Sequence, residues 1–154
     1  MTKIEHSIEI SSTRDVLWEI MSDVDNEAEY WYGTKSVSNI SKQGNEIERE
    51  ITQNFRNHKI KQRVVLHPKD SVDIQYLKGL TEGVKILTID TLEENKQRLK
   101  AFWDIRFPGI FRLTTPMLRS HVEKGTVEAL KRIKDAAETK NSAGQQKVKE
   151  ELRP

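Results

Sequence analysis

Residues 116–138 read PMLRSHVEKGTVEALKRIKDAAE, and this stretch decides the fold because its spacing predicts a long amphipathic helix. One face of that helix carries the apolar and small side chains, and charged side chains fill the other faces. The apolar face consists of Leu118, Val122, Gly125, Ala129, Ile133 and Ala136. A helix with a single apolar stripe is typical of one that packs against a sheet.

The middle of this stripe is unusually small. Gly125 and Ala129 lie where a packed helix often carries large side chains, and Gly inside a helix costs about 0.5–1 kcal/mol relative to Ala. Two interpretations remain open. Either a strand approaches the helix closely at this point, or the small residues leave room for a ligand.

The chain that precedes this helix predicts a sheet. Residues 3–11 alternate between apolar and polar side chains, which indicates a half-buried strand. Two short helices are expected at 14–22 and 26–32, and further strands at 34–42, 46–55, 59–67, 72–78, 84–92 and 98–107. Turn residues separate these runs, as in an antiparallel meander.

The two faces of this meander differ in character. The Glu-rich outer face of 46–50 adjoins the basic outer face of 59–63 along the chain, so ion pairs between these strands are expected. The apolar face needs a cover, and the long helix can supply it. The predicted fold class is therefore α+β: about seven antiparallel strands, two short helices between strands 1 and 2, and a long C-terminal helix.

Length and composition limit the classes of function. A chain of 154 residues is expected to form one domain, here residues 1–138, followed by a polar tail, 139–154, that is disordered or frayed. The 26 basic and 24 acidic residues give a net charge of +2 and no case for a nucleic-acid partner. No apolar run reaches the roughly 20 residues of a membrane span. The absence of cysteine and of an apolar secretion signal predicts a cytoplasmic protein.

Two segments resemble a known superfamily. IEISSTRDVLWEIMSD (8–23) and EYWYGTKSV (29–37) are similar to the opening strand and helix, and to the segment leading into the second strand, of START-like (SRPBCC) proteins. That group includes polyketide cyclase/dehydrase-type and coenzyme Q-binding proteins. The resemblance covers about residues 3–138, and it implies a helix-grip fold, in which a curved sheet is wrapped around the C-terminal helix with a cavity between them. Family members often have Pro before Trp31, where this chain has Glu29-Tyr30, which implies a differently shaped cavity mouth.

Several polar and aromatic side chains are predicted to face this cavity. The candidate lining residues are Arg49, Gln62, Tyr76, Thr88 and Trp103 from the strands and His121, Gly125 and Ala129 from the long helix. Polar groups that converge on one space orient an otherwise apolar ligand, and Arg49 is expected to anchor a carboxylate or carbonyl. The alternative is a register that is off by one residue, which turns every side chain of a strand to the opposite face. The aromatic run 30–32 forms either a gate at the mouth or the core of the short helices.

No motif indicates a metal, a cofactor or a catalytic centre. The four histidines form no HxH, HxxxH or HExxH pair, and no phosphate loop, GxGxxG or GxSxG sequence is present. The leading hypothesis is a non-catalytic carrier or sensor whose partner is a hydrophobic small molecule such as a lipid, an isoprenoid quinone or a polyketide-like compound. A cyclase/aromatase-type enzyme and a protein-binding module are the alternatives, and nothing in the sequence specifies an oligomeric state.

Overall fold

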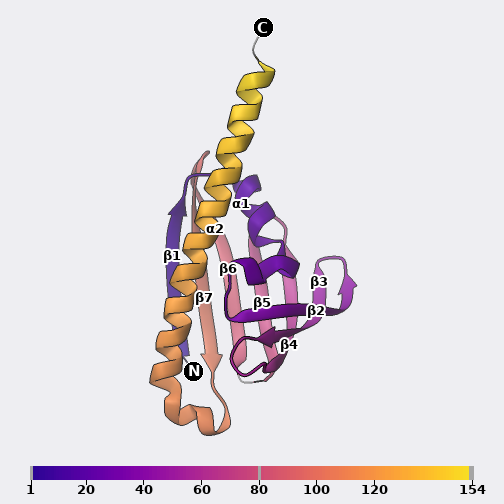
Figure 1. Cartoon of the computed structure of the whole chain (residues 1–154), viewed down its shortest axis with the longest axis vertical. Helices are drawn as coiled ribbons and strands as arrows, with labels where there is room; N and C mark the ends of the chain where they lie inside the picture. The colour runs from indigo at the N-terminus through magenta and orange to yellow at the C-terminus, as the bar shows by residue number, and fades with distance from the viewer. Residues whose placement is uncertain (1, 80, 153–154) are drawn as a thin grey trace.

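The computed structural model describes residues 2–79 and 81–152, with an antiparallel sheet of seven strands as its central element (Figure 1). The strands are β1 (Thr2–Ile10), β2 (Thr34–Gln43), β3 (Glu46–Gln53), β4 (Lys59–His67), β5 (Ser71–Lys78), β6 (Glu82–Glu93) and β7 (Lys96–Arg106). Their order across the sheet is β1-β7-β6-β5-β4-β3-β2. The strands β2 to β7 therefore form the predicted meander, and the first strand pairs with the last.

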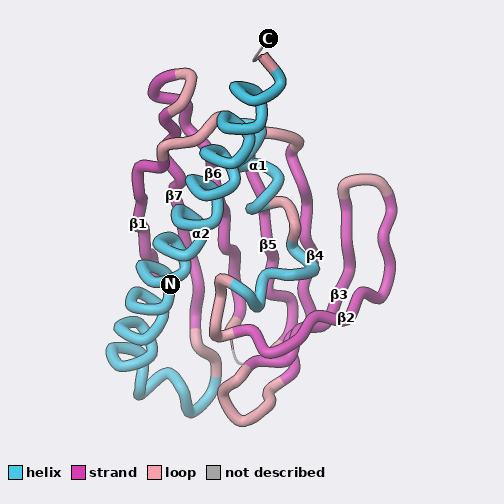
Figure 2. The backbone as a smooth tube through the Cα atoms, turned by 45° about the horizontal axis from the view of Figure 1, so that its top comes forward, coloured by secondary structure: helices cyan, strands magenta, loops and turns pink. Residues whose placement is uncertain are grey.

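The helices lie on one face of this sheet. The helix α1 (Arg14–Met21) and the 3₁₀ helix η1 (Val24–Glu29) connect β1 to β2, and η2 (Gly109–Thr114) leads from β7 into α2 (Thr115–Glu151). Figures 1 and 2 show α2 running along the β1 and β7 side of the sheet with α1 beside it, while the β2–β3 hairpin lies at the other end. This is the predicted α+β helix-grip arrangement. Among the described residues, no helix is both long and apolar enough to cross a membrane.

Local sequence explains where these elements begin and pair. The Thr13 hydroxyl accepts a hydrogen bond from the Val16 amide at 3.2 Å and caps α1. On the outer face of the sheet, Glu46 pairs with Arg63 at 2.9 Å, as the opposite charges of β3 and β4 predict. The core between sheet and helices is apolar; its largest buried side chains include Ile4, Ile10, Leu17, Leu99, Leu130 and Ile133.

The long helix extends beyond its predicted end at Glu138 and continues to Glu151. Contacts tie it to the start of α1 just past that position: Asn141 Oδ1 accepts from the Thr13 amide at 3.1 Å. Residues 142–151 are exposed, and their Ala, Gln, Lys and Glu side chains favour a helix without any packing. Polar composition alone therefore predicted the wrong boundary for this helix.

The prediction for the faces of β6 is off by one residue. Lys85, Leu87 and Ile89 are buried toward the helices, whereas Thr88 is half-buried on the opposite face and Asp90 is exposed. Both alternating sets of this strand contain large apolar side chains, so the pattern does not distinguish them. The correction places Lys85 on the inner face and removes Thr88 from it.

Candidate functional site

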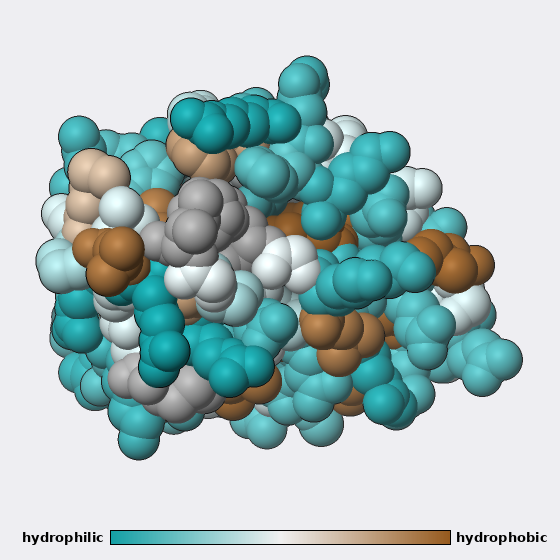
Figure 3. All heavy atoms as spheres, turned by 90° about the horizontal axis from the view of Figure 1, so that it is seen from below, coloured by the Kyte–Doolittle hydropathy of each residue, from teal (hydrophilic) through white to brown (hydrophobic). Residues whose placement is uncertain are grey.

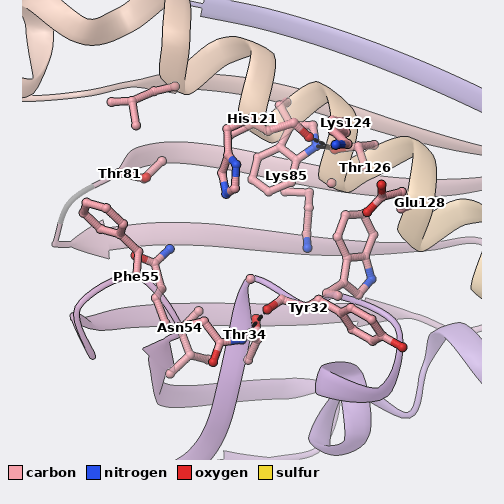
Figure 4. Close-up of a pocket in the computed structure, with 18 of the residues that line it drawn as sticks. Tyr32, Thr34, Asn54, Phe55, Thr81, Lys85, His121, Lys124, Thr126 and Glu128 are labelled. Carbon is pink, nitrogen blue, oxygen red and sulfur yellow. Dashed lines mark hydrogen bonds between the residues drawn. The ribbon is translucent and has the colours of Figure 1, made fainter.

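A cavity of about 580 Å³ lies between the inner face of the sheet and the first half of α2. Strands β3, β5, β6 and β7, the helix and the segment 31–34 form its walls (Figure 4). Its deepest side chains are nearly inaccessible to solvent; they are Ile51, Tyr76, Lys85, Trp103, Phe107 and Thr126. Its rim is exposed, with Tyr32 at 59% and Phe55 at 46% exposure. The space is therefore an inner chamber with one exposed side.

The floor of the cavity is aromatic. The rings of Trp31 and Trp103 meet edge to face with 6.1 Å between centroids, and Tyr76 lies 5.8 Å from Trp103. The Trp103 indole N–H donates to the Thr126 hydroxyl at 3.0 Å, and that hydroxyl donates to the Val122 carbonyl at 2.7 Å. Because β7 and α2 are joined in this way, the flat indole face is held in a fixed position.

Lys85 extends from β6 into this aromatic surrounding. Its Nζ lies 3.6 Å from the centroid of the Trp31 ring and 4.9 Å from that of Trp103. Figure 4 shows the side chain pointing into the cavity, toward the space that His121 faces from α2. Burial lowers the pKa of Lys85 to about 8 from its ordinary 10.5, although the Glu27 carboxylate acts in the opposite direction; Arg49 adds a smaller lowering.

Behind the wall lies a buried polar network around Arg49. The Arg49 guanidinium forms an ion pair with Glu27 and donates to Gln62 Oε1 and to the Val24 carbonyl, each at 2.9 Å. The Thr34 hydroxyl donates to the other Glu27 oxygen at 2.9 Å. All three nitrogens of Arg49 are thus engaged with η1 and β4, and the network fixes η1 against the sheet.

The rim is tied together by α2 and the segment that follows η1. The Arg132 guanidinium stacks over the Tyr32 ring at 3.4 Å, donates to the Tyr30 carbonyl at 3.0 Å and pairs with Glu128 at 3.6 Å. The Asn54 side chain donates to the Tyr32 carbonyl. Within the aromatic run 30–32, Tyr32 lies at the exposed rim and Trp31 is buried on the cavity wall.

The surface at the end of the molecule where α2 begins is mostly hydrophilic. Figure 3 views the molecule from that side, and the apolar side chains that it colours form separate areas among polar ones. The cavity lining has a different composition, because indole, phenyl and aliphatic side chains dominate its walls.

The structure brings half of the predicted cavity residues together. Tyr76, Trp103, His121 and Gly125 line the cavity. A Cβ atom added at Gly125 would meet no neighbouring heavy atom within 4 Å, so this glycine leaves open space. Ala129, in contrast, is fully buried in the packing between helix and sheet. Gly125 therefore lies at the open side of the cavity, whereas Ala129 lies in the packing.

The other predicted residues lie elsewhere. Arg49 and Gln62 lie in the network behind the wall, and Thr88 faces the opposite side of the sheet. The sequence analysis missed Lys85 and Thr126, both of which line the cavity. The only sequence signal for Lys85 was its alternation with Leu87 and Ile89, and the equally apolar alternate set concealed that signal.

Two of the side chains that line the cavity, Tyr76 and Lys85, have shifted pKa values. Tyr76 is fully enclosed, and burial raises the pKa of its phenol well above the ordinary range, with Glu27 adding to this effect. The phenol therefore stays neutral, whereas Lys85 can carry charge. Within residues 2–79 and 81–152, no cluster of three or more His, Asp or Glu side chains is arranged to hold a metal ion. The arrangement can enclose an apolar molecule and present a few polar groups to it.

The grip of the sheet on α2 and the enclosed cavity define a START-like protein. Residues 1–138 match the family model described as polyketide cyclase/dehydrase and lipid transport, and the chain belongs to this family. No curated protein matches the sequence.

Solved structures with the same fold are distant in sequence. The ZhuI aromatase/cyclase from Streptomyces sp. R1128 superposes with a TM-score of 0.75 at 18% identity, covering 89% of this chain and 93% of that chain. A protein from Thermus thermophilus gives 0.74 at 10% identity, covering 88% and 97%. A START superfamily protein from Mycobacterium smegmatis gives 0.64 at 14% identity, covering 92% and 97%. At these identities the comparisons establish the fold.

Proposed function

We propose that this protein binds a hydrophobic small molecule in the cavity between the sheet and α2, as a carrier or sensor. The observation that carries the proposal is a partly open cavity of about 580 Å³ with an aromatic floor. Small-molecule sites have about this volume and combine mostly apolar walls with a few polar groups. The lipid transport named in the family description supports the same function.

Affinity would come mainly from apolar surface that the ligand removes from water. Each 100 Å² of buried apolar area contributes about 2.5 kcal/mol. The indole of Trp103 is already fixed by its hydrogen bond to Thr126, so little side-chain entropy is lost when a ligand packs against it. A ligand binds more tightly to a wall that is already ordered than to a wall that must become ordered during binding.

A neutral fluorescent probe tests this proposal. N-phenyl-1-naphthylamine becomes bright in apolar surroundings, and we expect saturable binding to the native protein. Gly125→Phe adds a ring at an exposed position that lines the cavity, whereas Gly144→Phe, the matched control, adds the same ring at an exposed position of the same helix that does not line it. The probe should lose at least about tenfold in affinity for the first variant and bind the second like the native protein. Equal binding by both variants would place the probe outside the cavity.

A second candidate function is catalysis of the cyclase or aromatase type. The observation that favours it is the presence of Lys85 and Tyr76 on the sheet wall of the cavity and of His121 on the facing helix, because such groups can transfer protons to a bound chain. The ZhuI aromatase/cyclase and the di-domain ARO/CYC StfQ share this fold. The test is incubation with a synthetic aryl β-diketone chain, with mass spectrometry to detect loss of water. Dehydrated, cyclised product that disappears in Tyr76→Phe supports the enzyme, and unchanged recovery of the chain supports the carrier.

A further inference from the structure

Three charged side chains are buried close to the cavity floor, and their charges do not cancel. Arg49 is 0% exposed, Lys85 2% and Glu27 7%. The single carboxylate of Glu27 is taken by the Arg49 guanidinium and the Thr34 hydroxyl. One negative and two positive groups leave a net charge of +1, and the unbalanced charge belongs to Lys85.

The ammonium group of Lys85 has no anionic partner in the described part of the chain. It makes no hydrogen bond or ion pair there, and its contacts are the faces of Trp31 and Trp103. An aromatic face attracts a cation, but it accepts no conventional hydrogen bond from the three N–H donors of a lysine. A buried charge without such partners is costly, and Lys85 faces the cavity, so a molecule bound there can meet these donors.

The direction of the side chain shows where the missing partner must be. Lys85 lies on the inner face of β6 and points into the cavity, which is bounded by α2 on the other side (Figure 4). The Glu27 carboxylate is engaged elsewhere, and the rim carboxylate of Glu128 pairs with Arg132 at 3.6 Å. A counter-charge for Lys85 can therefore be supplied by a molecule bound in the cavity.

We infer that the ligand is an apolar molecule with one carboxylate, and that this carboxylate binds the ammonium group of Lys85 while the apolar body packs against Trp31, Trp103 and Tyr76. The inference rests on the proposed function and specifies the chemical class of its ligand. A single anionic group balances the buried charge and satisfies the free N–H donors with charge-assisted hydrogen bonds. An alcohol of the same shape offers the hydrogen bond without the charge.

Displacement of N-phenyl-1-naphthylamine by matched acids and alcohols tests the inference. Dodecanoate is compared with dodecan-1-ol, and 2-naphthoate with 2-naphthalenemethanol, so that aliphatic and aromatic bodies are distinguished. For at least one pair, the native protein should require an at least tenfold lower concentration of the acid than of the alcohol, the discrimination expected for a charge-assisted hydrogen bond. The pair with the larger ratio identifies the type of apolar body.

Two lysine variants locate the charge that is responsible. In Lys85→Met the acid-to-alcohol ratio should fall to about one, whereas Lys124→Met, which removes an exposed rim lysine, should keep the native ratio because exposed charges contribute little. Lys85→Gln is the second variant if Lys85→Met does not fold, as judged by circular dichroism. An acid preference that survives loss of Lys85, or that disappears with Lys124, overturns the inference.

The outcomes also distinguish this inference from the function on which it rests. If the native protein does not bind the neutral probe at all, the proposed function fails and the inference fails with it. If the probe binds and acids compete no better than alcohols, the cavity binds hydrophobic molecules but Lys85 does not select acids. Only the second outcome refutes the inference alone.

Discussion

Replacing Lys85 by Met should stabilise the ligand-free protein at neutral pH. Burial lowers the pKa of this lysine from 10.5 to about 8, and a shift of that size corresponds to about 3 kcal/mol of unfavourable free energy in the charged form. The cation–π contact with Trp31 offsets up to about 2 kcal/mol of this cost. Methionine keeps the apolar stem and most of the volume of the side chain. We therefore expect the unfolding free energy to increase by about 1–3 kcal/mol.

The pH dependence identifies the cause of this gain. Because the pKa of Lys85 is lower in the folded protein, the unfolded chain binds more protons between about pH 8 and 10.5, and native stability rises with pH in that window. The advantage of Lys85→Met is therefore complete at pH 7 and declines toward zero as the pH approaches 10.5. Below pH 8 the lysine is charged in both states, and the advantage is constant.

The other charged or titratable groups around Lys85 are common to both proteins, so their contributions cancel in the difference. They are Glu27, Arg49, Tyr76, His121, Lys124, Glu128 and Arg132. Urea unfolding followed by circular dichroism at pH 7, 9 and 10 measures the difference directly. A variant that is less stable than the native protein at pH 7, or an advantage that does not change with pH, would refute the assignment of a strained buried charge.

Three further perturbations test the packing around the cavity. Glu27→Gln leaves Arg49 buried without its counter-ion, and urea titration should show a loss of about 3–5 kcal/mol; a loss below about 1 kcal/mol would contradict the buried pair. Thr126→Val removes the acceptor of the Trp103 indole N–H, so we expect a loss of about 1–3 kcal/mol and a changed tryptophan emission, and an unchanged emission would contradict the contact. Deletion of residues 142–154 removes a stretch whose described side chains are all exposed, and it should change the melting temperature by no more than about 2–4 °C; a larger drop would mean that the stretch packs against the domain.

The architecture was predictable because it depends on local signals. Alternation along β1 to β7 and turn residues between them set strand boundaries that the structure reproduces within two residues. At the small centre of the helix stripe, Gly125 lines the cavity at an exposed position. Ala129, one turn later, is instead fully buried in the packing between helix and sheet. The distance between the helix and the sheet differs along the helix, and the sequence of the helix alone does not determine it.

The site was less predictable because β6 has two similar faces. Val84 and Ile86 on one face are matched by Leu87 and Ile89 on the other, and a strand with two apolar faces specifies its orientation weakly. The orientation is imposed by pairing with β5 and β7, whose inner faces are unambiguous. A lysine among apolar neighbours is ordinarily assigned to the solvent side, so the usual exposure of lysine also favoured the wrong face for Lys85.

The sequence analysis expected Arg49 to anchor a carboxylate or carbonyl of the ligand. The structure supplies Arg49 with a carboxylate from Glu27, 22 residues earlier in the chain, so its charge is neutralised within the protein. In our proposal the carboxylate of the ligand therefore binds Lys85, the buried cation that has no carboxylate partner in the described part of the chain. Which of two buried cations is free depends on where η1 packs, and only the folded chain determines that contact. The charge of the ligand therefore follows from the pairing of side chains within the protein, whereas the apolar character of the cavity follows from composition.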